Sequence, residues 1–482
     1  MCTVSGYASL DAEVCSPYAY KSRVLLIIAS NVANKLNSVA VGTQGVPVDL
    51  PAKTGDVFVA KSCHGTRDTS KDCSGPEKAY HLRARWRIVS PMRALLEDSK
   101  VASEDLRYAS RHSNYRAHNR LTPLRDGGET YASMLAAIRG AARSITLETY
   151  ILVDDATGTR FADALIERAQ TGIAVRLMYD AWGSWSLGTP YINRLTEAGV
   201  EVVEYNPVVP WRARFKLVLL TRRDHRKILI VDDQVAFTGG LNIANDYASK
   251  EDGGGGWRDA HLQVQGPIVR DLARLFHSVW VGSGGAAFEV GAASVSVGQA
   301  GDALASVISN RLTKRFQFRR AYLHAIRKAV RQIDIMNAYF IPGRAVRRAL
   351  RKAVARGVQV RVIVPGNSDV KAAQYASSYL YARMLKDGIR IFEWPKVMMH
   401  AKTAVIDGVW STVGSYNFDS QSLRANLEVA VAVLDRPLAK QLTIQFDADI
   451  ARCVEIEEGA LAKRNLWHRA LQWCAYRLRW FL

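Results

Sequence analysis

The sequence predicts an α/β protein in which one structural unit occurs twice. Short apolar stretches alternate with amphipathic stretches of helical period, and the same order of stretches appears again further along the chain. Strands that alternate with helices are typical of a sheet covered by helices. The chain has 482 residues, which is more than one hydrophobic core usually spans, so two domains, or two halves of a large one, are expected.

The repeat begins with a helix that leads into a strand. "AAIRGAARSITLETYI" (136–151) corresponds to "HAIRKAVRQIDIMNAYFI" (324–341), and each predicted strand ends at a tyrosine, Tyr150 or Tyr339. "FADALIERAQTGIAVRLMYD" and "AVRRALRKAVARGVQVRVIVPG" each predict a helix, a glycine stop and an apolar strand. "AGVEVVEYNP" and "DGIRIFEWP" follow. Each unit closes with a strand before a helix, "WRDAHLQVQG" or "ANLEVAVAVL".

The repeat divides the chain into four parts. Residues 1–118 are rich in Ser, Lys, Arg and Gly and show weak periodicity, so we expect a poorly defined N-terminal extension there. The first domain is expected over 119–300, with a Gly/Ala/Ser-rich linker at its end, and the second over 301–450. Residues 451–482 form a C-terminal tail.

Two stretches, "HRKILIVD" and "HAKTAVID", share the pattern HxKxxxxD. Side chains on a strand alternate between its faces, so His225 and Lys227 share one face, and so do His400 and Lys402. A lysine ammonium binds anionic oxygens, while an imidazole titrates near neutral pH and serves as nucleophile or acid. The pattern therefore indicates phosphate chemistry, with these four residues as catalytic candidates.

The aspartates of the two motifs, Asp232 and Asp407, complete the catalytic pattern. Each lies five residues beyond the motif's lysine, so strict alternation directs it away from the His/Lys face. We therefore interpret both aspartates as structural, bonded to neighbouring backbone or to a turn.

Further polar residues follow each motif. Asn242 in "GGLN", and Ser415 and Asn417 in "GSYN", are expected to hold phosphoryl oxygens as charge develops on them. Asp259 lies downstream of the first motif and Glu428 downstream of the second. A carboxylate behind each imidazole would fix its tautomer and stabilise its cationic form.

The charge of the chain points to an anionic partner. There are 65 Lys and Arg residues against 45 Asp and Glu, a formal charge of +20. Nucleic acid, anionic lipid headgroups and phosphorylated small molecules all fit this charge. The six cysteines show no metal-ligand spacing with histidine, and a reducing compartment is expected. No apolar run approaches the ~20 residues that span a bilayer.

Two segments are candidates for contact with a membrane. In "LAKRNLWHRALQWCAYRLRWFL" the residues Trp467, Leu471, Cys474, Leu478 and Phe481 recur at helical spacing, which predicts an amphipathic helix suited to a lipid interface. The alternative is a helix packed on the body of the protein. "RAVRRALRKAVAR" predicts a basic helical stripe, which suits an anionic surface or is simply solvated.

The two motifs and their followers resemble the phospholipase D superfamily, whose signature is HxKxxxxD followed by G-[GS]-x-N, twice per active site. Gly240 stands in the first copy where Ser415 stands in the second. "ETYI", "RRDHRKILIVDDQVAFTGGLNIANDY", "NAYFIP" and "HAKTAVIDGVWSTVGSYNFDSQSLRANLE" are most similar to bacterial cardiolipin synthases, especially to the shorter type without N-terminal transmembrane helices. The resemblance covers about 119–450.

The resemblance implies two tandem phospholipase D-like α-β-α sandwich domains, related by a pseudo-twofold, with a shared active site at their interface. It implies a phosphatidyltransferase that makes cardiolipin from phosphatidylglycerol and a second phospholipid alcohol through a covalent phosphatidyl-histidine. By family analogy His225 is the nucleophile and His400 the acid and base, although the residues alone leave these roles interchangeable. No metal and no cofactor is implied. The expected partners are phospholipid substrates and an anionic membrane surface, without nucleic acid, at the cytoplasmic face of a bacterial membrane.

Three alternatives remain open on the sequence. A phospholipase D that uses water or a small alcohol would share every catalytic residue. A nuclease of the same superfamily would suit the charge of +20. A membrane-binding scaffold without activity would require both His/Lys sets to be relics.

Overall fold

The computed structural model describes residue 99 and residues 101–212, 214–216, 219–291, 300–310, 316–459 and 465–480. The chain divides into two units, Met1–Ala94 and Leu95–Leu482, and every element below belongs to the second. Most of the predicted N-terminal extension therefore lies outside the described residues, as does Phe481 of the predicted tail helix.

The strands of the first half are β1 (Arg116–Asp126), β2 (Ser144–Thr149), β3 (Ala174–Asp180), β4 (Glu201–Tyr205), β5 (Ile228–Val231), β6 (Val235–Gly239) and β7 (Arg258–Gln265). Those of the second half are β8 (Ala303–Ser309), β9 (Gln332–Asn337), β10 (Gln359–Pro365), β11 (Arg390–Trp394), β12 (Lys402–Ile406), β13 (Trp410–Gly414), β14 (Val429–Leu434) and β15 (Val454–Glu455). Hydrogen bonds join them in the order β15-β11-β10-β9-β12-β13-β14-β8-β1-β7-β6-β5-β2-β3-β4.

This strand order confirms the predicted duplication. Read outward from the β8–β1 junction, one side runs β1-β7-β6-β5-β2-β3-β4 and the other runs β8-β14-β13-β12-β9-β10-β11. In each half, antiparallel strands lie toward the junction and three parallel strands follow them outward. In the second half the short antiparallel strand β15 lies beyond β11 at the edge of the sheet. The two halves therefore present equivalent elements to each other.

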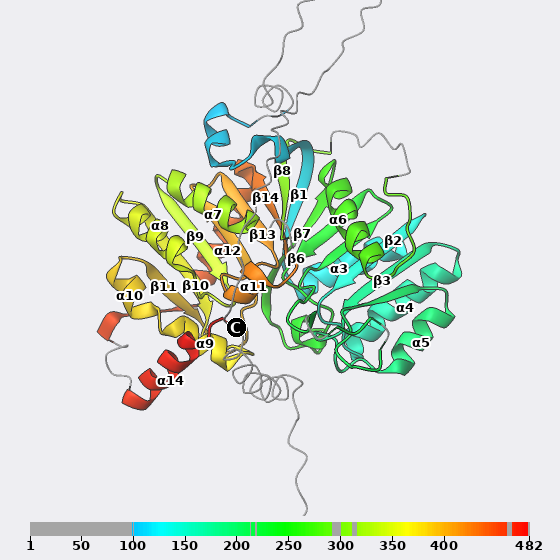
Figure 1. The fold of residues 1–482 in the computed structure, drawn as a ribbon. Helices are drawn as coiled ribbons and strands as arrows, with labels where there is room; N and C mark the ends of the chain where they lie inside the picture. The colour runs from blue at the N-terminus through cyan, green and yellow to red at the C-terminus, as the bar shows by residue number, and fades with distance from the viewer. Residues whose placement is uncertain are drawn as a thin grey trace, which may run out of the picture. The chain divides into compact units, whose positions relative to one another are not determined.

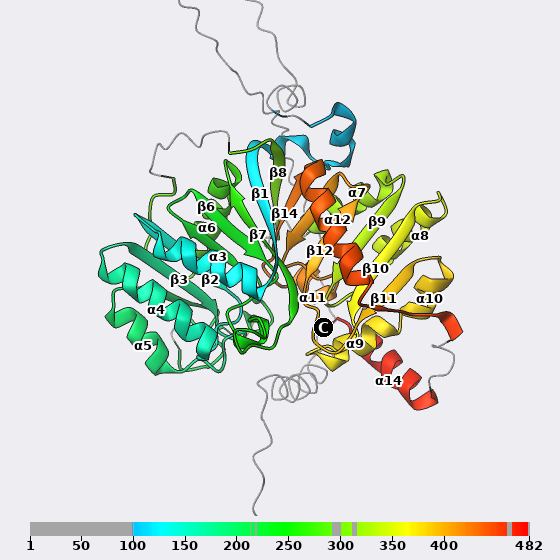
Figure 2. The same cartoon turned by 180° about the vertical axis from the view of Figure 1, so that it is seen from behind.

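The helices of the first half are α3 (Gly127–Arg139), α4 (Ala156–Gln170), α5 (Thr189–Glu197) and α6 (Ile268–Gly282). Those of the second half are α7 (Gln317–Lys328), α8 (Arg344–Val354), α9 (Lys371–Ser378), α10 (Tyr381–Lys386), α11 (Ser420–Arg424), α12 (Arg436–Ile450) and α14 (Leu466–Arg477). Figure 1 shows α6, α7 and α8 on the near face of the sheet, and Figure 2 shows α3, α4 and α12 on the opposite face. Helices on both faces agree with the predicted α-β-α layers.

The two halves share one hydrophobic core. Ile228 and Leu262 from the first half lie in the same buried cluster as Met399, Val413 and Val431 from the second. The ends of β5, β7, β12 and β14 that carry the predicted site residues therefore meet across this core.

The start of the compact unit differs from the predicted boundary at residue 119. Leu106, Tyr108 and Tyr115 are buried in the core of the second half. The Tyr108 hydroxyl donates a hydrogen bond to the Asp407 carboxylate, far along the chain. Residues 101–118 therefore belong to the fold and not to an extension. Their weak periodicity hides this because they form short 3₁₀ turns, Ser103–Tyr108 and His112–Asn114, before β1.

Within the described residues, no helix is both long and apolar enough to cross a membrane.

Candidate active site

The two predicted histidines lie just before β5 and β12. The backbone of each is hydrogen-bonded to the other half of the protein. The backbone N–H of His225 donates to the carbonyl of Leu427 at 2.9 Å, and that of His400 donates to the carbonyl of Arg258 at 2.7 Å. His225 is 7% exposed and His400 3%. Packing between the halves therefore fixes both imidazoles in a buried site.

The carboxylates behind the imidazoles are exchanged between the halves. His225 Nδ1 lies 3.0 Å from Glu428 Oε2, and His400 Nδ1 lies 2.8 Å from Asp259 Oδ2. The structure thus places a carboxylate behind each imidazole, but each histidine uses the carboxylate that follows the other motif. The order of residues along the chain does not reveal this exchange, because it depends on a contact between distant strands.

The two carboxylates differ in their environment. Burial raises the pKa of Glu428 to about 7, although Lys227 and the Ser415 hydroxyl favour its charged form. Burial also acts on Asp259, but the adjacent His400 and Lys402 outweigh it and hold the pKa of that carboxyl below its usual value. Asp259 is therefore the stronger partner for an imidazolium.

Both lysines of the motifs are buried beside the histidines. Lys402 Nζ lies 2.8 Å from His400 Nε2, and Lys227 Nζ donates to the His225 carbonyl at 2.7 Å and lies 5.1 Å from the centre of the Tyr150 ring. Burial, and for Lys227 also the repulsion from Lys402, lowers their pKa values to about 7 for Lys227 and about 8 for Lys402. An anion bound between two such ammonium groups would restore their charge.

The imidazoles are neutral in the free protein near neutral pH. Burial, followed by the charges of Lys227 and Lys402, lowers the pKa of His225 well below its usual value. Burial and Lys402 also lower the pKa of His400, although Asp259 opposes them. Each ring therefore has one nitrogen with a free electron pair, which a nucleophile or a base requires.

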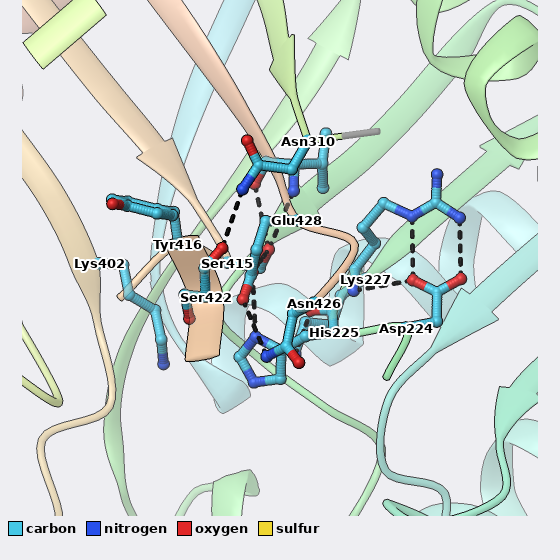
Figure 3. A network of polar contacts seen from close by, with 12 residues as sticks. Asp224, His225, Lys227, Asn310, Lys402, Ser415, Tyr416, Ser422, Asn426 and Glu428 are labelled. Atoms are coloured by element: carbon cyan, nitrogen blue, oxygen red, sulfur yellow. Dashed lines mark hydrogen bonds and ion pairs between the residues drawn. The ribbon is translucent and has the colours of Figure 1, made fainter. Parts of the chain in front are cut away.

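The free nitrogens differ between the two rings. His400 Nε2 shares a hydrogen of the Lys402 ammonium. His225 Nε2 has no hydrogen-bond partner among the residues that the structure describes. Figure 3 shows Glu428 between Ser415 and His225, with Lys402 and Lys227 on opposite sides. Of the two rings, His225 is the one whose Nε2 is open to a substrate atom.

The predicted phosphate-binding residues are buried near the histidines, but two of them already bond to protein atoms. The Ser415 hydroxyl donates to Glu428 Oε2, the oxygen that also contacts His225. Asn242 accepts from the Ile151 N–H at 3.1 Å and donates to the Tyr247 hydroxyl at 2.6 Å.

Asn417 Oδ1 has no partner among the described residues. Contact with phosphate therefore stays a prediction for Asn242, Ser415 and Asn417, whereas the link of Ser415 to Glu428 is direct.

The difference between Gly240 and its counterpart Ser415 has a steric explanation. A Cβ atom at Gly240 would lie 2.0 Å from Asp259 Oδ1, so the short aspartate occupies the space that a serine side chain would need. In the other copy Ser415 is accommodated beside the longer Glu428. Each copy thus combines a side chain and a carboxylate that fit together: Gly240 with the shorter Asp259, and Ser415 with the longer Glu428.

The motif aspartates lie at the far ends of β5 and β12 from the histidines. Asp232 accepts from the backbone N–H groups of Ala142, Arg143 and Ser144 at 2.7–2.9 Å. Asp407 accepts from those of residues 330–332, each at 2.8 Å. Both aspartates therefore lie away from the imidazoles, so listing them among the catalytic residues is wrong. Their contacts agree with the interpretation as structural residues. Each fixes the corner between a helix and the next strand.

A buried ion network that the sequence did not predict lies beside His225. Arg226 donates to both oxygens of Asp224 at 2.9 and 2.8 Å, and the same guanidinium contacts Glu148. Burial raises the pKa of Glu148 well above its usual value, although the charge of Arg226 acts to lower it. Since the protonated form of Glu148 is favoured, Asp224 and Arg226 form the ion pair. The available signal was Glu148 inside the otherwise uncharged strand β2, since Asp224 and Arg226 precede β5 in a charged stretch.

The second half replaces this network with apolar residues. Met399 and Ala401 flank His400 as Asp224 and Arg226 flank His225. The strand registers place Met336 opposite Thr403 as they place Glu148 opposite Ile228. The same backbone positions thus tolerate either a buried ion pair or an apolar cluster.

Aromatic rings enclose the imidazoles. Tyr150, one of the two predicted strand-end tyrosines, packs edge-on against His225 with ring centres 4.8 Å apart. The ring centres of Tyr247, Trp257 and Tyr339 lie 5.4, 6.1 and 6.3 Å from that of His400. Tyr247 and Trp257 were not predicted as site residues.

No group of three or more His, Cys, Asp or Glu side chains in the described part of the chain is arranged to hold a metal ion. The donor set of the site consists of imidazoles paired with single carboxylates and of ammonium groups. Such a site suits an anionic phosphodiester, since ammonium groups bind anionic oxygens and an imidazole can serve as nucleophile or acid.

The fold and the site define a phospholipase D-like protein with two HxKxxxxD motifs in one active site. The sequence profile of the family described as "Cardiolipin synthase, PLD-like domain" matches residues 134–280 and 322–450. The chain belongs to this family of enzymes.

Named relatives agree with this assignment. "Probable cardiolipin synthase YwiE" of Bacillus subtilis is 32% identical over 356 residues, 74% of this chain and 71% of the relative. "Cardiolipin synthase B" of Salmonella typhimurium is 33% identical over 361 residues, 73% of this chain and 86% of the relative. Among solved structures, phosphatidylserine synthase of Haemophilus influenzae has a TM-score of 0.56 at 13% identity and covers 75% of this chain and 95% of its own, which shows a common fold.

The matched pairs generate a first prediction. Gly240→Ser should displace the Asp259 carboxylate from His400 and reduce phosphodiester turnover by on the order of 10²-fold or more, because His400 loses its partner. Gly240→Ser combined with Asp259→Glu reproduces the arrangement of the other copy and should recover part of the turnover. Turnover and thermal unfolding are measured together; equal turnover in the single and double variants would refute the steric explanation.

The ion network generates a second prediction, on stability. Arg226→Ala leaves buried Asp224 without its cation and should lower the free energy of unfolding by about 3–5 kcal/mol. The triple change Glu148→Met, Asp224→Met and Arg226→Ala copies the second half and should bring stability back close to wild type. Denaturant unfolding tests this, and a triple variant as unstable as Arg226→Ala would contradict it.

Proposed function

We propose that this protein is a phosphatidyltransferase that makes cardiolipin from phosphatidylglycerol and a second phospholipid alcohol. The observation that carries the proposal is the pair of exchanged histidine–carboxylate contacts beside two buried lysines, in a chain of the cardiolipin synthase family. A covalent phosphatidyl-histidine is the intermediate in this proposal.

In the first half-reaction His225 attacks the phosphorus of phosphatidylglycerol. The open Nε2 of His225 supports the nucleophile role for this ring. Its electron pair forms the N–P bond, and the P–O bond to the glycerol breaks. Binding of the anionic phosphodiester raises the proton affinity of the neutral His400 ring, which takes up a proton from solvent at Nε2, and Asp259 stabilises the resulting imidazolium. His400 Nε2 then gives this proton to the departing glycerol oxygen.

In the second half-reaction the same groups act in reverse. His400 takes the proton from the hydroxyl of the second phospholipid, whose oxygen attacks phosphorus and breaks the P–N bond. His225 then returns to its neutral form with Glu428 on Nδ1. The two steps exchange one phosphate ester for another, so they are close in energy.

Lys227 and Lys402 hold the non-bridging oxygens of the phosphodiester in this proposal. Both ammonium groups are buried beside the imidazoles, where an electrostatic interaction is stronger than in water. In this proposal Asn417, whose buried side-chain oxygen has no partner within the described residues, orients a substrate hydroxyl.

An anionic membrane surface, at the cytoplasmic face of a bacterial membrane, is the proposed place of action. The charge of +20 supports it, and so does α8, whose cations Arg344, Arg348, Arg351 and Lys352 are all exposed. Each such charge contributes about 1 kcal/mol near an anionic leaflet.

A third prediction tests the reaction. His225→Ala and His400→Ala should each abolish conversion of labelled phosphatidylglycerol to cardiolipin and glycerol while binding to vesicles survives. Products are separated by chromatography with and without added phosphatidylethanolamine. Phosphatidic acid as the main wild-type product would favour a phospholipase D instead, and degradation of nucleic acid a nuclease. Substantial turnover in either histidine variant would remove the two-histidine mechanism.

A fourth prediction concerns pH. The kcat/KM for a short-chain soluble phosphatidylglycerol should fall as pH rises through about 7 to 8, because Lys227 and Lys402 lose their positive charge above these pKa values. It should also fall below about 7, where Glu428 becomes protonated and ceases to support a charged His225. Glu428→Gln should remove the acid limb only; an unchanged acid limb in that variant would contradict the assignment.

A further inference from the structure

The C-terminal helix α14 packs on the protein with a mixed face, in which polar side chains lie beside the partly buried Ala475 and Tyr476. Gln472 is buried and its amide donates to the Ser378 hydroxyl at 2.9 Å. His468 packs edge-on against Tyr375 of α9, with ring centres 5.3 Å apart. A surface helix of a globular protein normally buries its largest apolar side chains, whereas α14 leaves Leu466, Trp467 and Trp473 exposed.

Large apolar side chains of the same helix face outward. Trp467 is 74% exposed, and Leu466, Leu471, Trp473 and Leu478 are exposed as well. Large apolar side chains gathered on one outer face indicate a surface that is covered by a partner. The sequence predicted an amphipathic helix here, and the structure shows which way it is turned.

This outer face lies at the active-site edge of the second half. α14 packs on α9, and α9 follows a loop in which Asp369 accepts from the Tyr339 hydroxyl at 2.8 Å. Tyr339 in turn packs against His400. Beyond α14, the Trp480 ring lies 4.3 Å from the Arg424 guanidinium of α11, the short helix that Figure 1 shows between the two halves.

The first half presents exposed tryptophans at the same edge. Trp185 follows Ser184, whose hydroxyl donates to the Tyr150 carbonyl at 3.2 Å, directly beside His225. Trp211 is 82% exposed in the segment that runs from the end of β4 to His225. Gln421 of α11 donates to the Thr221 carbonyl of that segment and so links it to the side where Trp480 lies.

All the exposed tryptophans of the described residues therefore lie on segments that these contacts join along the active-site edge. They are Trp185, Trp211, Trp467, Trp473 and Trp480, which we name the tryptophan rim.

The charged residues in the two longest segments of the tryptophan rim are all basic. The segments 206–222 and 465–480 contain no Asp or Glu, but include Arg212, Arg214 and Arg469 on their exposed surface. Tryptophan is the side chain best suited to the boundary between headgroups and acyl chains, and arginine pairs with lipid phosphates. This combination fits an anionic bilayer better than a protein partner, whose apolar site would not require a basic surround.

We propose that the tryptophan rim is the surface by which the protein docks on an anionic phospholipid bilayer, with both halves inserted and the active site open to the membrane. The inference rests on the proposed function, since a lipid-transferring site must receive its substrates from a bilayer. It goes beyond the tail helix, because the first half contributes Trp185 and Trp211.

The fifth prediction tests this surface with the full chain and vesicles of phosphatidylglycerol and phosphatidylcholine. Trp211→Ser with Trp467→Ser should weaken vesicle binding by on the order of tenfold or more, and each single variant should lose less. Val330→Ser with Ile444→Ser is the matched control, because both residues are similarly exposed but lie on elements outside the rim, and it should bind like wild type. Binding of wild type should also weaken with added salt.

Turnover of a short-chain soluble phosphatidylglycerol separates docking from chemistry. The rim variant should keep this turnover within about twofold of wild type, since no rim residue contacts the imidazoles or lysines. Unchanged vesicle binding in the rim variant would overturn the proposal. It would also be overturned if the wild type formed a dimer and the rim variant were a monomer, because the face would then be a contact between copies of this chain. Vesicle binding without any wild-type transfer would instead count against the proposed function alone.

Discussion

The exchange of carboxylates between the halves is the contact on which the site depends. Glu428 holds His225 and Asp259 holds His400, and backbone hydrogen bonds from the same two segments fix both histidines. Neither half contains a complete histidine–carboxylate pair of its own. The duplicated chain is therefore one catalytic unit, and the buried interface between the halves is as necessary to the chemistry as the imidazoles are.

Burial gives the site its reactivity. Lysines with pKa values of about 7 and 8, and neutral imidazoles beside them, occur here because few water molecules can stabilise the charged forms. An incoming phosphodiester supplies the missing negative charge. The free protein is thus prepared for an anion, and binding of the substrate restores the charge that the transfer step requires.

The pseudo-twofold symmetry is broken at the residues to which the proposed mechanism gives two different roles. Asp259 with Gly240 and Glu428 with Ser415 place carboxylates of different acidity behind the two rings. A buried ion pair lies beneath one ring and methionines lie beneath the other. These differences offer a physical basis for one histidine that attacks and another that moves protons, which the repeated motifs alone do not provide.

The sequence by itself determined the duplication, the strand and helix order, and the pairing of histidine with lysine on one face. These follow from local periodicity, which a single segment carries. Only the tertiary structure decided that the carboxylates cross between halves, that residues 101–118 join the core, and that α14 turns large apolar side chains outward. Each of these depends on contacts between segments far apart in the chain, and no local pattern records which distant partner a side chain meets.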